Sequence, residues 1–477
     1  MNQKSFSPKY FKLVITAVSL AVLSGCVSVN FEQSLATTNQ TATDFTQGQL
    51  SLAQTKEQRD AQGIVAAEIL QKPIGQSDAV RLALVNSPAL QAMLAQNWAD
   101  AARAAQTGRI ANPVLSFERL TSVGELDIGR KLSFGLLDLL TLPQRYGIAK
   151  RQVAAAQLRL TNSVIEQVTQ VRGAWVTAVA AQQNLIYARQ VNEAAQASAE
   201  LARRMLAAGN FTKLQRARQQ AFYADSATGL AAAQHASTSA REKLVRLLGL
   251  TDTQAAELVL PARLPDMPRD PRRPDEVGKL ASSARLDLKL AQAEFEGAAK
   301  AQGLSTVTTF TDIELGVKRE TKSDLASGTS TLSRSHDISV RIPIFDWGGI
   351  KRDAMNAQTL AAANRLEAIT RAAGSNLRES YSAYRTAFDV SRHYRDEVVP
   401  LRKTISEENV LRYNGMLIGV FELLADSRDQ VSSVMAAIAA EQQFWLADAA
   451  LQASLMGKPT MAFVGVMAAS GGSDAKH

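Results

Sequence analysis

The chain has 477 residues, and its 53 Lys and Arg against 45 Asp and Glu give a formal net charge of +8. Hydrophobic residues make up 46 % and charged residues 21 %, which excludes an intrinsically disordered chain. The length suggests about three domains. A single cysteine excludes a disulfide framework and a cysteine-rich metal cluster, and four scattered histidines argue against a histidine-built metal site. Beyond the N-terminus, no apolar run of about twenty residues predicts a transmembrane helix.

Residues 1–25 have the pattern of a secretory signal peptide. Three lysines precede a short apolar segment, 13–23, which is too short for a stable membrane span. The sequence Leu-Ser-Gly-Cys26 then resembles a bacterial lipobox, which implies that Cys26 carries covalent lipid and begins the mature chain. Two or three acyl chains anchor a protein stably to a membrane. Val27, in place of an Asp, favours the outer membrane; the alternative is a plain signal peptide with an incidental cysteine.

Loss of residues 1–25 removes three lysines and no acid, so the net charge falls from +8 to +5. This is a small excess for a chain of this size. Together with secretion, it argues against a nucleic-acid partner.

The composition divides the mature chain into five parts. Residues 26–75 are rich in Gln, Thr, Ser and Ala, and we interpret them as a lipidated, extended or partly ordered tether. Two similar halves, 76–260 and 275–458, are joined by a Pro-, Arg- and Asp-rich linker, 261–274. Residues 459–477 are expected to form a flexible C-terminal tail.

Two very long helices dominate these halves. Apolar residues recur in steps of three and four over about 148–208 and 349–414, as in coiled coils. About 60 residues at 1.5 Å rise span roughly 90 Å, more than a globular domain can enclose. A returning helix is predicted after each, over about 212–248 and 420–456. Shorter helices are predicted over 77–85, 88–108, 275–284 and 287–303.

The second half repeats the order of the first at an offset near 200 residues. The dipeptide Lys-Arg at 150–151 recurs at 351–352, and Gly249 and Gly457 close the two returning helices. The chain is therefore predicted to be a duplicated helix–hairpin–helix unit.

Each half also carries two segments in which apolar and polar residues alternate. In the second half these are 307–317 and 338–344, separated by a predicted polar loop over 319–335. In the first half they are 114–121 and 128–137, where Arg130 falls on the apolar side. Alternation over about ten residues is typical of transmembrane β-strands. A half-buried strand of a soluble sandwich is the alternative.

Four strands cannot close a barrel, and an open sheet edge is not tolerated in lipid. Eight strands, from two chains, leave little lumen, whereas three chains supply twelve. Cyclic symmetry would place the long helices of all chains around the same axis. The sequence therefore predicts a pore extended by a helical tunnel.

Several sequence segments resemble the TolC-type outer-membrane efflux proteins, from about Ile74 to Lys458. The segments that carry the resemblance are SDAVRLALVNSP at 77–88, Asn-Pro at 112–113, RIPIFDWGG at 341–349, Tyr-Asn-Gly at 413–415 and FELL at 421–424. The resemblance implies a mainly α-helical homotrimer with a twelve-stranded β-barrel, a periplasmic α-barrel and a mixed equatorial part. It also implies docking to a periplasmic adaptor (membrane fusion) protein and an inner-membrane pump. Residues 136–143 depart from the pattern, and their placement stays open.

No catalytic motif is present in the sequence. It lacks a phosphate-binding glycine loop, a GxSxG elbow and an HExxH helix motif. We therefore expect a protein that is not an enzyme and has no cofactor besides the lipid on Cys26, so that the energy source lies in a partner.

The acids at the start of the last helix are the candidate gate. Glu422, Asp426 and Asp429 share one helix face, and threefold symmetry would stack them as acidic rings that attract cations. The resemblance implies that acids here narrow the periplasmic entrance. A solvated face with acids favoured by the helix dipole is the alternative. By the same resemblance Tyr413 occupies the position of a gate-latching tyrosine, and Lys213 stands where an acid is usual, so that Lys213 and Glu422 could form a substitute latch.

The turns at Gly209-Asn210 and from Gly415 to Gly419 are the adaptor contacts that the resemblance implies. The predicted function is a passive trimeric conduit, gated at its periplasmic end, within a tripartite efflux system. The alternative is a non-conducting periplasmic coiled-coil lipoprotein with a structural or adaptor role.

Overall fold

The computed structural model describes residues 29–308, 312–342, 344–345 and 347–459. These residues form two compact units. The sheet unit contains the described residues up to Ser34 together with Gln96–Leu160 and Leu288–Thr370. The hairpin unit contains Leu35–Ala95, Thr161–Asp287 and the described residues from Arg371 onward.

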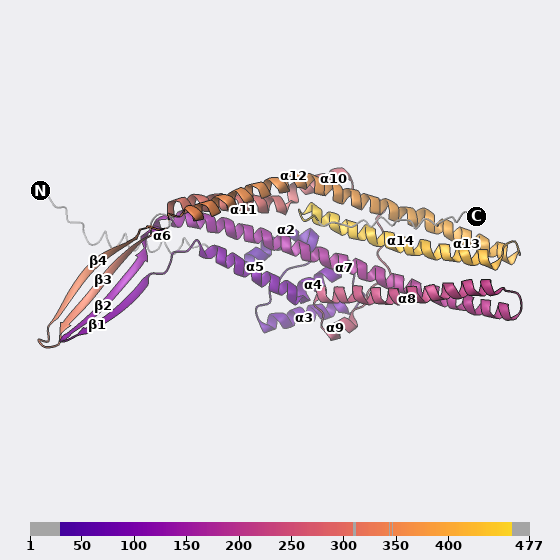
Figure 1. The fold of residues 1–477 in the computed structure, drawn as a ribbon, viewed down its shortest axis with the longest axis horizontal. Coiled ribbons are helices and arrows are strands. Elements are labelled where there is room, and N and C mark those ends of the chain that lie inside the picture. The colour runs from indigo at the N-terminus through magenta and orange to yellow at the C-terminus, as the bar shows by residue number, and fades with distance from the viewer. Residues whose placement is uncertain (1–28, 309–311, 343, 346, 460–477) are drawn as a thin grey trace. The chain divides into compact units, whose positions relative to one another are not determined.

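The sheet unit is built around one four-stranded antiparallel sheet in the order β1-β2-β3-β4 (Figure 1). The strands are β1 (Val114–Ser122), β2 (Glu125–Gly135), β3 (Asp312–Asp324) and β4 (Ser330–Arg341). Gly124 and Gly328 adopt positive φ angles, of 80° and 68°, in the two hairpin turns. Glycine suits these positions because it pays no Cβ penalty in the left-handed region.

The second β-hairpin differs from its prediction at both ends. The expected polar loop over 319–335 is wrong, because β3 continues to Asp324 and β4 begins at Ser330. Backbone ladder bonds need no apolar side chains, so the polar ends of these strands remain paired. At the other end, residues 307 and 308 belong to helix α11 (Leu286–Thr308), and residues 309–311 lie outside the described residues.

In the first half, β2 is displaced from the predicted 128–137 to Glu125–Gly135. The open segment 136–143 forms a short helix, α6 (Leu136–Leu140), and the start of a long one. That long helix is α7 (Leu142–Ala207), whose 66 residues span about 100 Å at 1.5 Å per residue. Its part up to Leu160 belongs to the sheet unit.

Within the sheet unit, α7 contacts α11 through two ion pairs. Arg159 donates to Glu294 at 2.7 Å, and Arg151 pairs with Glu296. The unit also contains α5 (Pro88–Gln106) from Gln96 onward and α12 (Gly349–His393) as far as Thr370.

The hairpin unit contains two antiparallel helix pairs. The first is the later part of α7 with α8 (Lys213–Leu248), and the second is α13 (Val399–Asn414) with α14 (Val420–Leu455) (Figure 1). Smaller helices pack beside them: α3 (Lys56–Leu70), α4 (Gln76–Asn86), α9 (Asp252–Glu257) and α10 (Pro274–Ala284). Among the helices of the described residues, none is both long and apolar enough to cross a bilayer.

The helix predicted over 349–414 is interrupted by one π-helical turn, Tyr394–Val398, between α12 and α13. Pro400 explains the interruption. Proline has no N–H to donate to the carbonyl four residues earlier, and its ring would clash with that carbonyl. A local widening to π geometry accommodates both constraints.

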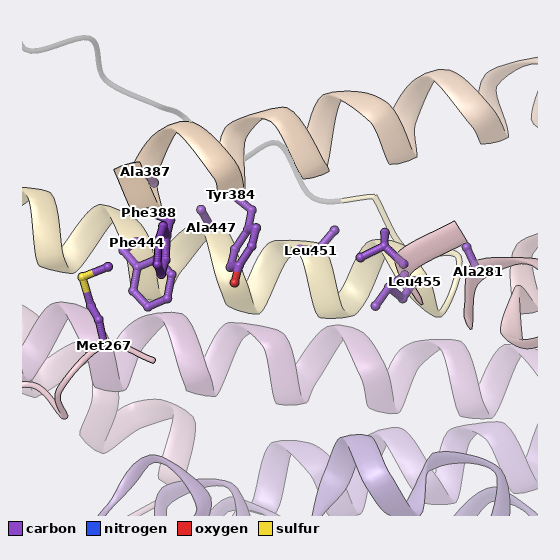
Figure 2. Close-up of a cluster of buried hydrophobic side chains, with 10 residues drawn as sticks. Met267, Ala281, Tyr384, Ala387, Phe388, Phe444, Ala447, Leu451 and Leu455 are labelled. Carbon is purple, nitrogen blue, oxygen red and sulfur yellow. The ribbon is translucent and has the colours of Figure 1, made fainter. Parts of the chain in front are cut away.

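One apolar core of the hairpin unit lies between α12, α14 and the linker (Figure 2). Tyr384 and Phe388 of α12 pack against Phe444 of α14, with ring centroids 5.7 and 5.8 Å apart. Met267 of the linker is buried in the same cluster. The indole of Trp445 donates to the linker carbonyl of Pro265 at 3.1 Å, so the linker is packed onto the helices.

Residues 26–75, expected to be extended or partly ordered, contain two helices. They are α2 (Phe31–Thr46) and α3, and Phe31, Leu35 and Phe45 of α2 are buried. These apolar residues lie in helical spacing but are diluted by Gln and Thr, which obscured the pattern in the sequence. The buried guanidinium of Arg172 on α7 donates to the carbonyl of Phe45, which ties this segment to the hairpin unit.

Candidate functional site

One face of the sheet is polar, and each of its lysines is paired with an acid. Its lysines form cross-strand ion pairs with acids: Lys131 with Asp337 at 2.5 Å, Lys318 with Glu118 at 3.4 Å, and Lys322 with Asp127 at 3.6 Å. Gly129 and Gly316 lie on the same face and are buried, because neighbouring side chains close over them. A Cβ on Gly316 would come within 2.2 Å of the Asp337 carboxylate, so glycine leaves room for these charged side chains.

The other face of the sheet is apolar and exposed. Phe117 and Ile338 are 71 % and 69 % exposed, and Leu132 is 45 % exposed. The register places Leu115, Leu132 and Val317 in one row across three strands. An apolar patch of this kind is rare on the surface of a soluble monomer and marks contact with lipid or protein.

The turns of both helix pairs lie at the same end of the hairpin unit (Figure 1). In the α7–α8 turn, Gly209 has φ 76° and Asn210 donates its N–H to the carbonyl of Met205. In the α13–α14 turn, Gly415 follows α13, Met416 has φ 58°, and Gly419 is the N-cap of α14. Both sets of predicted contact residues are therefore turn residues.

The three candidate gate acids have different surroundings on α14. Glu422 is exposed in the first turn. Asp426 is only 7 % exposed, and its Oδ2 has no hydrogen-bond partner among the described residues. Asp429 is exposed and pairs with Arg402 of α13 at 3.3 Å. A shared helix face therefore does not give these acids a shared environment within one chain.

Tyr413, in the last turn of α13, and Lys213 lie beside the two interhelical turns, and both are exposed. Lys213 is the first residue of α8. Within the described part of this single chain, no ion pair joins Lys213 to Glu422. A latch between them would have to form in another conformation or between chains. Cys26, the predicted lipidation site, lies outside the described residues.

Two arginines near the acids were missed by the sequence reasoning. Arg428 lies 4.3 Å from the ring centroid of Phe222 and donates to the carbonyl of Arg218 at 3.4 Å, which joins α14 to α8. Arg402 neutralises Asp429. Arg402 and Asp429 lie a similar number of residues before and after the turn of the second helix pair, so the sequence could have placed them opposite each other. No local sequence pattern indicated the contact between Arg428 and α8.

No family model matches the chain, and no curated protein matches it. Solved structures do match. The transmembrane channel CusC is 17 % identical, covering 82 % of this chain and 92 % of its own, with a TM-score of 0.65. The outer membrane protein VceC of Vibrio cholerae is 15 % identical, covering 83 % and 97 %, with a TM-score of 0.65.

The outer membrane channel MtrE of Neisseria gonorrhoeae, solved in its open state, is 18 % identical. It covers 83 % of this chain and 89 % of its own, with a TM-score of 0.63. The chain has the fold of these outer-membrane channels. The prediction of a TolC-type fold, mainly helical with four strands per chain, is thereby confirmed. In an outer-membrane channel fold, the two-faced sheet and the turn end of the helix pairs become the parts to examine for function.

Proposed function

We propose that the chain is the outer-membrane channel component of a tripartite efflux system, a passive trimeric conduit from the periplasm to the exterior. The sheet carries the proposal. Its four strands have one exposed apolar face and one polar, charge-paired face, within the fold of outer-membrane channels. These are the two faces that a barrel wall presents to lipid and to a watery lumen.

The strand lengths fit this role. The four strands have 9, 11, 13 and 12 residues, against the 9–11 or so that a tilted strand needs to cross a bilayer. β1 and β4 are the outer strands of the four-stranded sheet, and each leaves an edge that lipid would not tolerate. Pairing β4 of one chain with β1 of the next, three times over, closes a twelve-stranded barrel that supports an open lumen.

The turn end of the helix pairs is proposed as the periplasmic gate and docking end. Glu422, and Asp426 in an arrangement that uncovers its carboxylate, would face the axis as acidic rings, and Tyr413 and Lys213 would hold the closed arrangement. The turns at Gly209-Asn210 and Gly415–Gly419 would contact a periplasmic adaptor, which in turn meets an inner-membrane pump. Lipid on Cys26 would add an anchor in the outer membrane. Opening is then a population shift driven by partner binding.

The test of the conduit is direct. The mature protein, extracted from membranes with detergent, should run as a heat-modifiable trimer and produce stepwise ion currents in planar lipid bilayers. A monomer that is extracted without detergent and carries no current would instead support the coiled-coil lipoprotein alternative.

The gate has its own test in the same bilayers. Glu422→Gln with Asp426→Asn should raise the single-channel conductance and lower the preference for cations, because the acidic rings are lost. Asp225→Asn with Glu242→Gln removes the same charge from exposed positions on α8 and is the matched control. Equal currents from the two double variants would dismiss the acidic gate.

A further inference from the structure

The apolar face of the sheet carries a row of arginines that the strand register brings together. Arg130 on β2 lies directly opposite Arg319 on β3, and Arg319 lies directly opposite Arg334 on β4. Arg119 on β1 pairs with Ile128, two residues from Arg130 on the same face. Three guanidinium groups thus stand side by side on neighbouring strands, with a fourth diagonal to them.

This row has no counter-charge on its own face. The register places on this face four arginines and no Asp or Glu among the described residues of the strands. On the polar face, Lys131, Lys318 and Lys322 all pair with acids. None of the four arginines has an ion pair within the described part of the chain. Like charges directly opposite on neighbouring strands destabilise a sheet, and an anion from outside the chain would offset their repulsion.

The row also divides the face into two zones. From the row toward the helices, the face is apolar except for His336; its residues are Leu115, Leu132, Phe134, Ile313, Leu315, Val317, Ile338 and Val340. From the row toward the hairpin turns, Thr121, Thr321, Ser323 and Ser330 join three apolar residues. A charged side chain on a lipid-facing strand costs far less at the edge of the hydrocarbon than at its midplane. The row lies midway along the strands, but exposed apolar side chains continue past the end of β4 at Ile342 and Ile344, 70 % and 67 % exposed. The apolar band is therefore displaced toward the helices, and the row fits its outer boundary, where lipid headgroups would begin.

The chemistry of the side chains selects the ligand. Guanidinium groups bind phosphate oxygens through two parallel N–H bonds, and arginine suits such pairing better than lysine. Neighbouring strands lie about 4.8 Å apart, so the row spans about 10 Å, comparable to a headgroup with more than one phosphate. We propose that Arg130, Arg319 and Arg334, assisted by Arg119, bind the phosphate groups of anionic lipids at the outer edge of the apolar band. This inference rests on the proposed transmembrane role of the sheet.

The experiment compares lipid binding by the detergent-purified full chain and a triple variant, Arg130→Gln with Arg319→Gln and Arg334→Gln. Native mass spectrometry reports bound cardiolipin and bound phosphatidylcholine. The unmodified protein should bind cardiolipin in preference to phosphatidylcholine. In the triple variant the ratio of the two should fall about tenfold, because charge-assisted hydrogen bonds are lost. The matched control, Lys131→Gln with Lys318→Gln and Lys322→Gln, removes the same charge from the polar face and should keep the preference.

The inference would be overturned by no cardiolipin preference in the unmodified protein, by an equal loss in both triple variants, or by complete competition from inorganic phosphate at the lipid's concentration. The last would indicate a general anion site. The heat-modifiable trimer band checks folding, and if the triple variant lacks it, Arg319→Gln alone should weaken cardiolipin binding about threefold. A triple variant that still conducts as a trimer but binds cardiolipin unchanged would refute the lipid site and leave the conduit intact.

Discussion

The two halves of the chain, 76–260 and 275–458, have the same order of main elements, but they differ in helix continuity and in helix capping. In the first half the long helix α7 runs for 66 residues without a break, whereas in the second a π-helical turn separates α12 from α13. The first half starts its returning helix with a side-chain cap, and the second does not. The comparison teaches that the backbone plan of the duplicated unit tolerates large differences in the local chemistry that supports it.

The closure of each returning helix is what the halves share most closely. Gly249 follows α8 with φ 68°, and a Cβ there would lie 2.4 Å from Pro88 Cδ and 2.7 Å from Ser87 Cα. Gly457 follows the end of α14 with φ 87°, and its Cβ would lie 2.4 Å from the Asp287 carboxylate. In both halves a left-handed glycine therefore seats the returning helix on the turn between the two shorter helices.

The largest predicted effect comes from removing this glycine. Gly249→Ala should destabilise the protein by about 3 kcal/mol, since left-handed strain adds to a clash with fixed backbone. Gly457→Ala should cost less, about 2 kcal/mol, because its shortest contacts are with the Asp287 side chain, which can move, and its contact with fixed backbone, Asp287 N at 2.9 Å, is longer than the 2.7 Å backbone contact of Gly249. Gly209→Ala is the control: its φ is 76° but no atom lies within 4 Å of the new Cβ, so only about 1 kcal/mol of strain is expected. Thermal unfolding measures the order, and equal shifts for all three would contradict the packing argument.

Much of this architecture could be predicted because it depends on local pattern. The steps of three and four gave the long helices, and the turn glycines gave their ends. The π-helical turn could not be placed, since Pro400 permits either a kink or a local widening. Helix α2 was missed because Phe31, Leu35 and Phe45 are scattered among Gln and Thr.

The candidate sites were predictable to a different degree. The gate acids were found because their spacing is local, whereas the pairing of Asp429 with Arg402 depends on how two antiparallel helices align. Arg130 was noticed as an exception on an apolar face. Arg319 and Arg334 fell within the predicted polar loop, so the row of arginines emerged only from the register of the paired strands.

A partly buried acid, Glu441, distinguishes the returning helix of the second half, and its effect on stability should depend on pH. Burial, with a contribution from Asp266, raises the pKa of Glu441 to about 7, while Arg263 and Arg395 oppose the shift. The matching part of α8, residues 226–241, contains no acid. The folded state therefore holds the proton of the Glu441 carboxyl more tightly than the unfolded state does. As a result, the free energy of unfolding should fall as the pH rises from about 4.5 to about 7.

Glu441→Gln should remove this loss. Relative to the unmodified protein, the variant should gain stability with rising pH, reaching about 1.5 kcal/mol at pH 8 once screening by water around the partly buried side chain is allowed for. Unfolding temperatures between pH 5 and pH 8 measure the difference. Glu242→Gln on α8, an exposed acid of the first half, is the control. The same pH dependence in both variants would show that the effect does not come from burial of Glu441.

The smallest predicted effects concern the starts of the two returning helices. Thr212 accepts the N–H of Gln215 at 3.2 Å, and the Gln215 side chain accepts the N–H of Thr212 at 2.6 Å, a complete capping box. Gly419 offers no side chain, although its extended backbone, with φ −81° and ψ 159°, and the space around it would admit one. The first turn of α14, which carries Glu422, is therefore less firmly held than the first turn of α8.

Hydrogen-exchange mass spectrometry can measure each start separately, in peptides covering 209–220 and 415–428. Thr212→Ala should speed exchange in the first peptide, by the loss of about 1 kcal/mol of capping, and Thr212→Ser should keep the native rate. Gly419→Ser should slow exchange in the second peptide slightly. Serine stabilises an N-cap by only about a few tenths of a kcal/mol more than glycine does. Should Thr212→Ser exchange as fast as Thr212→Ala, the difference between the two hairpins would have to come from packing. In that case, a new cap on α14 would leave the first turn around Glu422 as mobile as before.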